Sequence, residues 1–111
     1  MVEPEFAAQA RELASRADVY GTAGCLTRAA SALVQALFAL NETYFASEKT
    51  ALAVIERFAR RPDRFRARLE SALARPGTSA AELGESVREI ESLFRDCTEL
   101  AGDLYRSRWK L

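Results

Sequence analysis

Three residues with polar side-chain ends, Asn41, Tyr44 and Glu48, lie on the apolar face of the second helix that the sequence predicts. Their spacing of three and four residues predicts adjacent turns of one helix face, at positions where leucine or phenylalanine would otherwise point. A buried amide or carboxylate is costly unless it is paired, by about 1–3 kcal/mol for a neutral group and more for a charge. The spacing therefore indicates either an internal network, with Glu48 bound to an arginine, or the lining of a ligand cleft or subunit interface.

A second candidate is the segment 57–68, which holds six arginines and one aspartate. Arginines interleaved with phenylalanines can bind phosphates and stack on bases. The candidate phosphate contacts are Arg60, Arg61 and Arg64. However, Phe58 and Phe65 also fit inward-facing helix positions, which would leave the arginines solvated or paired with the acidic residues of the C-terminal segment. We expect the solvated or internally paired arrangement, with nucleic acid as the alternative partner.

The sequence lacks the other patterns through which small proteins usually perform catalysis. It contains no histidine, which excludes imidazole bases, histidine-ligated metals and Ser-His-Asp triads. It also has no glycine-rich phosphate loop, no cysteine pair at metal spacing and no serine elbow. We therefore predict that the chain is not an enzyme by itself and that it carries no cofactor or metal.

The size and charge of the chain predict one domain over residues 1–111. Sixteen Lys and Arg balance sixteen Asp and Glu, which argues against whole-molecule attraction to nucleic acid or to an anionic membrane. The N-terminus is acidic and resembles no signal peptide, and no uninterrupted apolar run approaches the roughly 18–20 residues of a membrane span. Cys25 and Cys97 occupy apolar positions, so we predict buried free thiols and a cytoplasmic protein without membrane contact.

The composition favours an all-α fold. The chain has 21 alanines and 13 leucines but only five glycines and three prolines, and alanine and leucine lose little conformational freedom in a helix. The breaks predict an up-and-down bundle of four main helices plus one short helix. The predicted spans are 4–17, 22–46, 48–60, 63–73 (the short helix) and 79–104. Glycines 21 and 24 mark the first break, Ser47 and Asp63 are predicted caps, and Ser79 with Glu82 forms a capping box.

The predicted second helix carries two apolar faces. Leucines, valine and phenylalanines form a broad one, and small residues form another, at Ala29, Ala32, Ala36 and Ala39. A helix with so little polar surface lies in the centre of a bundle or at a subunit interface. The small face is suited to close approach by a neighbouring helix, which makes a homodimer one expected assembly.

The stretch Leu37–Lys49 (LFALNETYFASEK), together with Gly24–Arg28 before it and Arg61–Phe65 after it, resembles the helical C-terminal region of small bacterial nucleotidyltransferases of the polymerase-β superfamily. The resemblance covers residues 20–75, about half of the chain. It implies a substrate-binding or accessory bundle similar to the HEPN-type bundles that accompany such enzymes. In that family, catalysis belongs to an N-terminal domain with a Gly-Ser turn and paired aspartates, which residues 1–20 lack.

The resemblance also implies a partner and a set of contact residues. The expected partner is a nucleotidyltransferase catalytic domain, in cis or in trans. The residues carried over as substrate or partner contacts are Arg28, Asn41, Tyr44, Glu48 and Lys49. HEPN ribonucleases require a histidine a few residues after an arginine, so ribonuclease activity is not expected here.

Overall fold

The computed structural model of the chain describes the backbone of residues 4–109 and the side chains of residues 6–103. This described part consists of five α-helices and contains no strand, which confirms the all-α class. The helices are α1 (Pro4–Ser15), α2 (Val19–Leu40), α3 (Ala51–Ile55), α4 (Phe65–Ala74) and α5 (Ala80–Trp109).

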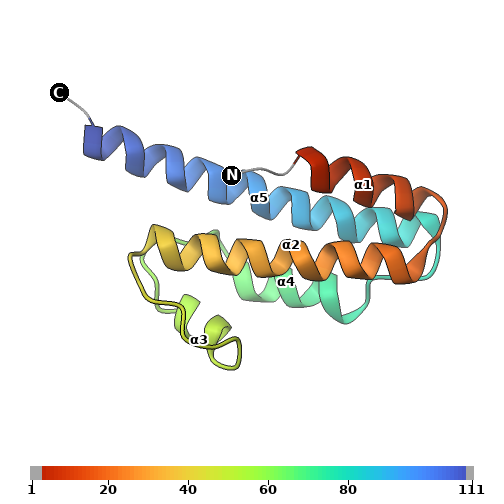
Figure 1. Ribbon diagram of the computed structural model, residues 1–111, viewed down its shortest axis with the longest axis horizontal. Coiled ribbons are helices and arrows are strands. Elements are labelled where there is room, and N and C mark those ends of the chain that lie inside the picture. The colour runs from red at the N-terminus through yellow and green to blue at the C-terminus, as the bar shows by residue number, and fades with distance from the viewer. Residues whose placement is uncertain (1–3, 110–111) are drawn as a thin grey trace.

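The four longer helices run in alternating directions, so the chain forms the predicted up-and-down bundle (Figure 1). The helices α2 and α5 pack against each other, and each also contacts α1 and α4. Figure 1 shows α1 and α4 on opposite sides of this central pair. It also shows that α1 begins near the middle of α2, so that α2 and α5 both continue past its N-terminal end.

The core lies along α2 and α5 because apolar side chains recur on both helices at spacings of three and four. Its fully buried members include Leu26, Leu33, Leu37, Leu83, Val87 and Ile90. The outer helix α1 is joined to α5 by the rings of Phe6 and Phe94, whose centroids lie 5.6 Å apart, and by an ion pair between Arg11 and Glu91.

The first break lies earlier than predicted. Ala17 adopts a left-handed conformation with φ of 56°, and Asp18 caps α2 by accepting a hydrogen bond from the Gly21 N–H at 2.8 Å. Gly21 and Gly24 therefore lie inside α2, and their assignment to the break was wrong. An aspartate three residues before an amide is a strong helix start, and it outweighs the helix-weakening effect of the glycines.

The segment between α2 and α4 differs most from the prediction. The second helix ends at Leu40 instead of 46, and the helix expected over 48–60 is only the five residues of α3. Ser47 and Asp63 do not cap helices: Thr50 and Arg64 occupy the N-cap positions, without side-chain caps. The helix predicted as short, α4, is one of the four longer ones.

The capping box at the start of α5 is confirmed. The Ser79 hydroxyl accepts from the Glu82 N–H at 3.1 Å, and the Glu82 carboxylate accepts from the Ser79 N–H at 3.3 Å. The same carboxylate accepts from the Thr78 N–H at 3.0 Å. These contacts satisfy amide groups that have no partner within the helix.

The helix α2 is long and apolar enough to cross a membrane by length and composition alone, with Arg28 as its one charged residue. The sequence-based expectation considered only uninterrupted apolar runs and therefore did not identify this helix. Core helices of water-soluble bundles meet the same criterion, and 44% of the apolar window in α2 is buried inside the bundle. Packing against α1, α4 and α5 accounts for the buried part of this apolar surface.

Candidate functional site

The structure does not bring the predicted contact residues onto one helix face. Because α2 ends at Leu40, Asn41 is its C-cap, and Tyr44 and Glu48 lie in the following loop, where both are exposed. The prediction that these side chains point inward from a helix was wrong. Arg28 lies 13 residues before Asn41 along α2, which corresponds to about 20 Å at 1.5 Å per residue. The predicted residues therefore fall into two regions.

The Asn41 side chain clamps two loops together. Its Nδ2 donates to the Leu37 carbonyl and to the Arg60 carbonyl, both at 2.8 Å, and its Oδ1 accepts from the Arg60 N–H at 3.1 Å. The internal network expected for this residue is therefore formed with the backbone and not with the neighbouring polar side chains. It fixes the loop after α2 against the loop before α4.

The two aromatic residues after this clamp point in opposite directions. Phe45 packs edge-on against Phe38, with ring centroids 5.2 Å apart, and Phe58 packs against the same ring at 5.1 Å. Tyr44, by contrast, is 87% exposed. The loop therefore presents one aromatic ring to solvent from a backbone that is held on both sides.

Glu48 and Lys49 lie in the turn that leads to α3. The backbone N–H of Lys49 donates to the Ser47 hydroxyl at 3.1 Å. The Glu48 side chain borders a mainly apolar pocket of about 220 Å³ between α2, α3 and α4, whose wall includes Ser31 and Leu69. Glu48 is the only charged residue of that lining.

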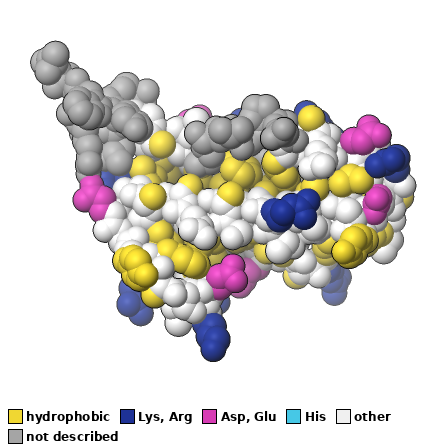
Figure 2. All heavy atoms as spheres, viewed as in Figure 1, with side chains coloured by type: hydrophobic (Ala, Val, Ile, Leu, Met, Phe, Trp, Pro, Cys, Tyr) yellow, Lys and Arg dark blue, Asp and Glu magenta, His cyan; other side chains and the backbone are white. Residues whose placement is uncertain are grey.

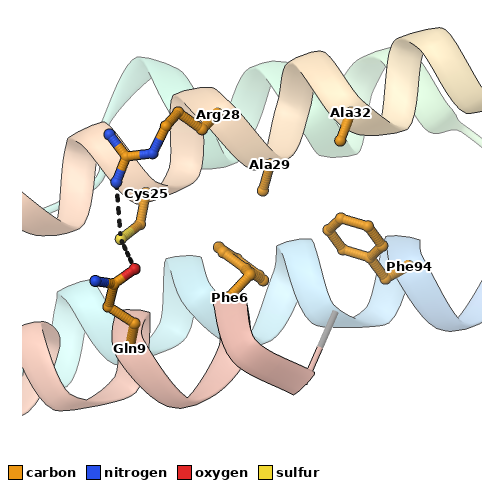
Figure 3. A pocket seen from close by; sticks show the side chains of 7 residues that line it. All are labelled: Phe6, Gln9, Cys25, Arg28, Ala29, Ala32 and Phe94. Carbon is orange, nitrogen blue, oxygen red and sulfur yellow. Dashed lines mark hydrogen bonds between the residues drawn. The ribbon is translucent and has the colours of Figure 1, made fainter. Parts of the chain in front are cut away.

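Arg28 lies in a second pocket, of about 160 Å³, at the N-terminal end of α1 (Figure 3). Its Nη2 donates to the Cys25 sulfur at 3.5 Å, and the Cys25 thiol donates to Gln9 Oε1 at 3.9 Å. The remaining lining is apolar and consists of Phe6, Ala29, Ala32 and Phe94. The pocket thus has three polar groups at one end and aromatic and small side chains at the other, as Figure 3 shows.

Beyond this pocket, α2 presents a face that α1 does not cover. We call it the uncovered α2 face and define it by Ala32, Gln35, Ala36 and Ala39. Ala36 is half-buried and the other three are exposed. Figure 2 shows few charged groups along the part of α2 that faces the viewer. Of the four alanines predicted to receive a neighbouring helix, only Ala29 is fully buried in the bundle.

The arginines of segment 57–68 divide into two groups. Arg68 donates to Glu89 at 2.9 Å and to Asp96 at 2.8 Å, and it also reaches the Ser92 hydroxyl. Burial alone would lower the pKa of Arg68, but the hydrogen bonds to the two carboxylates outweigh it and leave the pKa raised. Arg66 likewise binds two carboxylates, though at a more exposed position. The predicted pairing with the acidic residues of the C-terminal segment therefore holds for Arg68, whereas Arg66 pairs internally with Glu56 and Glu70.

The other arginines of the segment are not paired in this way. The guanidinium groups of Arg57, Arg60 and Arg64 have no ion-pair or hydrogen-bond partner within the described part of the chain. Arg61 donates to the carbonyl of Phe58 at 2.6 Å. All four side chains are exposed. The sequence suggested one basic segment of six arginines, but the fold divides it into paired and unpaired residues.

Neither cysteine side chain is exposed. Both cysteines are buried and free, as predicted. Burial raises the pKa of the Cys97 thiol to about 12, so it is protonated at neutral pH. In the described residues no group of three or more acidic or cysteine side chains is arranged to hold a metal ion.

No protein-family model matches this chain, and no curated protein or solved structure is detectably similar to it. The resemblance to nucleotidyltransferases therefore stays a prediction. Its motif residues nevertheless have distinct positions in the fold: Asn41 and Phe45 hold the loop, whereas Tyr44, Glu48 and Lys49 are exposed on it. The sequence did not predict the hydrogen bonds of Asn41 to Arg60, although an asparagine after a helix is a common C-terminal signal.

Proposed function

We propose that the chain is a non-catalytic helical module that binds a nucleotidyltransferase catalytic domain, in the same polypeptide or in a separate one. The observation that carries the proposal is the uncovered α2 face, which leads into the pocket beside Arg28. Small side chains on a rigid helix let another element approach closely. The resemblance supplies the class of partner, and Arg28 belongs to both the resemblance and the pocket.

The binding role is supported by the chemistry of the described side chains. The thiols are buried, and the carboxylates that border α5 bind arginines or lie on the surface. A catalytic site for acyl transfer needs a nucleophile, a base and an oxyanion-binding group within reach of one another. A docking surface needs only a complementary face and a few polar groups that fix orientation.

The test compares two matched substitutions on exposed helix alanines. Ala32→Arg places a long charged side chain on the uncovered α2 face, whereas Ala67→Arg makes the same change on α4. The tagged wild-type chain is used to capture partners from a lysate of its own cells, and the captured proteins are identified by mass spectrometry. We expect a nucleotidyltransferase with wild type and Ala67→Arg, and at least tenfold less of it with Ala32→Arg. Absence of any nucleotidyltransferase, or equal recovery with both variants, contradicts the proposal.

A homodimer is the second candidate, because the same small-residue face suits a second copy of the chain. Light scattering of the concentrated protein separates the two. A dimer mass for wild type and Ala67→Arg, with a monomer mass for Ala32→Arg, would support self-association through this face. A monomer mass for wild type excludes it.

A further inference from the structure

Within the described residues, the bundle neutralises some arginines of segment 57–68 and leaves the others without a carboxylate. Arg66 and Arg68 each bind two carboxylates. The four exposed guanidinium groups of the loop 57–64, which we call the basic loop, bind no carboxylate in the described part of the chain. Asp63 is the only acidic residue within this loop. A local charge of about +3 therefore stands on a chain of zero net charge.

The basic loop has a fixed backbone. Phe58, Pro62 and Phe65 are buried and anchor it to the core. Arg64 is held in a left-handed conformation with φ of 54°, and the Phe65 N–H donates to the Pro62 carbonyl at 3.2 Å. Groups mounted on a fixed backbone lose less conformational entropy when they bind a ligand.

An exposed aromatic ring is tied to this loop. The Asn41 clamp binds the backbone of Arg60 on one side, and Tyr44 follows three residues later in the chain. Figure 1 shows the segment after α2 and the segment before α4 at the same end of the bundle. Exposed guanidinium groups and an 87% exposed ring therefore belong to two loops joined by hydrogen bonds.

We propose that the basic loop and Tyr44 bind single-stranded nucleic acid. Guanidinium groups form bidentate hydrogen bonds with phosphate oxygens. An exposed aromatic ring stacks on a base whatever its sequence, but only unpaired bases offer a free face. An acidic peptide would satisfy the arginines and leave the ring without a role, so the pairing of both features favours a single strand over a protein.

The small charge of the basic loop limits the affinity that this contact can have. With no net charge on the whole chain, attraction comes only from the loop itself. Each phosphate neutralised on a single strand contributes about 0.7 to the slope of log K against log salt. Four arginines therefore give a slope of at most about −3, and binding is strong only at low salt.

The test uses fluorescence anisotropy of a labelled uridine oligonucleotide, about 12 residues long and so within the site size of a small binding surface. We expect binding at low salt that weakens at least tenfold in the double variant Arg60→Gln/Arg64→Gln. The matched control is Arg75→Gln, which removes an exposed arginine at the far end of α4 and should change binding less than twofold. The salt slope should fall by about 1.4 in the double variant only.

The ring is tested separately from the charges. We expect Tyr44→Ala to weaken binding about tenfold and Tyr44→Phe to retain it, because stacking needs the ring and not the hydroxyl. Tyr20→Ala, at the other end of α2 where Tyr20 is 91% exposed, is the control. Ala32→Arg should leave oligonucleotide binding unchanged, so this proposal and the proposed docking to a nucleotidyltransferase can fail independently.

Four results would overturn the proposal. They are no binding of the oligonucleotide at low salt, equal binding by the double variant, tighter binding of a duplex than of the single strand, and competition by polyglutamate or inorganic polyphosphate as strong as by unlabelled oligonucleotide. The last would show that the loop attracts any polyanion and does not recognise bases. Loss of binding in both Tyr44→Ala and the double variant, with their controls unchanged, supports the proposal.

Discussion

Asn41 binds both polar groups of the Arg60 backbone, although the two residues lie 19 positions apart. Its carboxamide donates to the carbonyl and accepts from the N–H, as a neighbouring backbone strand would. A third bond, to the Leu37 carbonyl, ties the same side chain to the last turn of α2. Asn41 therefore ends α2 and fixes the loop that carries Tyr44 against the basic loop.

This relationship predicts a clear cost for Asn41→Ala. The substitution removes three hydrogen bonds, of which the one to the Leu37 carbonyl is partly buried, so we expect a loss of about 1–3 kcal/mol in the free energy of unfolding. Urea denaturation measures the loss. Glu48→Ala, at an exposed position, should change stability by less than about 0.5 kcal/mol. Equal effects of the two substitutions would contradict a specific role of the clamp.

The fold class and the start of α5 follow from local patterns. The capping box of α5 and the inward positions of Phe58 and Phe65 depend on residues within a few positions of one another, and all were predicted correctly. The end of α2 was not, because the apolar spacing continues through Phe45 after the helix has stopped. Only the partner at Arg60 shows why the chain turns at Asn41.

The candidate sites were less predictable than the fold, for a related reason. The pairing of Arg68 depends on how α4 is rotated against α5, and not on its own sequence neighbours. Arg68 faces α5 and reaches Glu89 and Asp96, while Arg64, four residues earlier, lies in a left-handed turn outside the helix. A segment that is uniformly basic in sequence is therefore divided by the fold.

The Arg68 cluster predicts that two neighbouring arginines differ in their effect on stability. The Arg68 side chain is 18% exposed and joins α4 to two carboxylates and a hydroxyl on α5. Arg68→Ala leaves those carboxylates partly buried without a partner, so we expect a loss of about 2–3 kcal/mol by urea denaturation. Arg66→Ala, at a side chain that is 40% exposed, should have little effect because solvent screens its ion pairs. A larger loss for Arg66→Ala would refute this account.

Replacement by alanine should have opposite effects on stability at Gly77, which precedes α5, and at Gly84, which lies inside it. Gly77 has φ of +109°, and an added Cβ would lie 2.3 Å from the Glu82 Cβ and 3.1 Å from its backbone carbon. We therefore expect Gly77→Ala to destabilise the protein by about 2 kcal/mol or more. At Gly84, inside the helix, the nearest atom to an added Cβ is Arg88 Nη1 at 3.6 Å, an ordinary contact. Gly84→Ala should stabilise by about 0.5–1 kcal/mol, as measured by urea denaturation. Shifts of the same sign would be inconsistent with this geometry.

The capping carboxylate of α5 predicts a pH dependence of stability. Hydrogen bonds from the Thr78 and Ser79 N–H groups lower the pKa of Glu82 below its ordinary value of 4.5. A carboxylate whose pKa is lower in the folded state stabilises that state above the ordinary value, and the effect disappears as the pH falls through the lowered one. The difference in melting temperature between wild type and Glu82→Gln should therefore be largest near neutral pH and shrink well below pH 4.5. Comparison with Glu82→Ala provides the control, because neither variant titrates at this position and the gap between them should not change with pH. If the wild-type protein kept the same margin of melting temperature over both variants at low pH, the charge of Glu82 would not contribute to the stability of the start of α5.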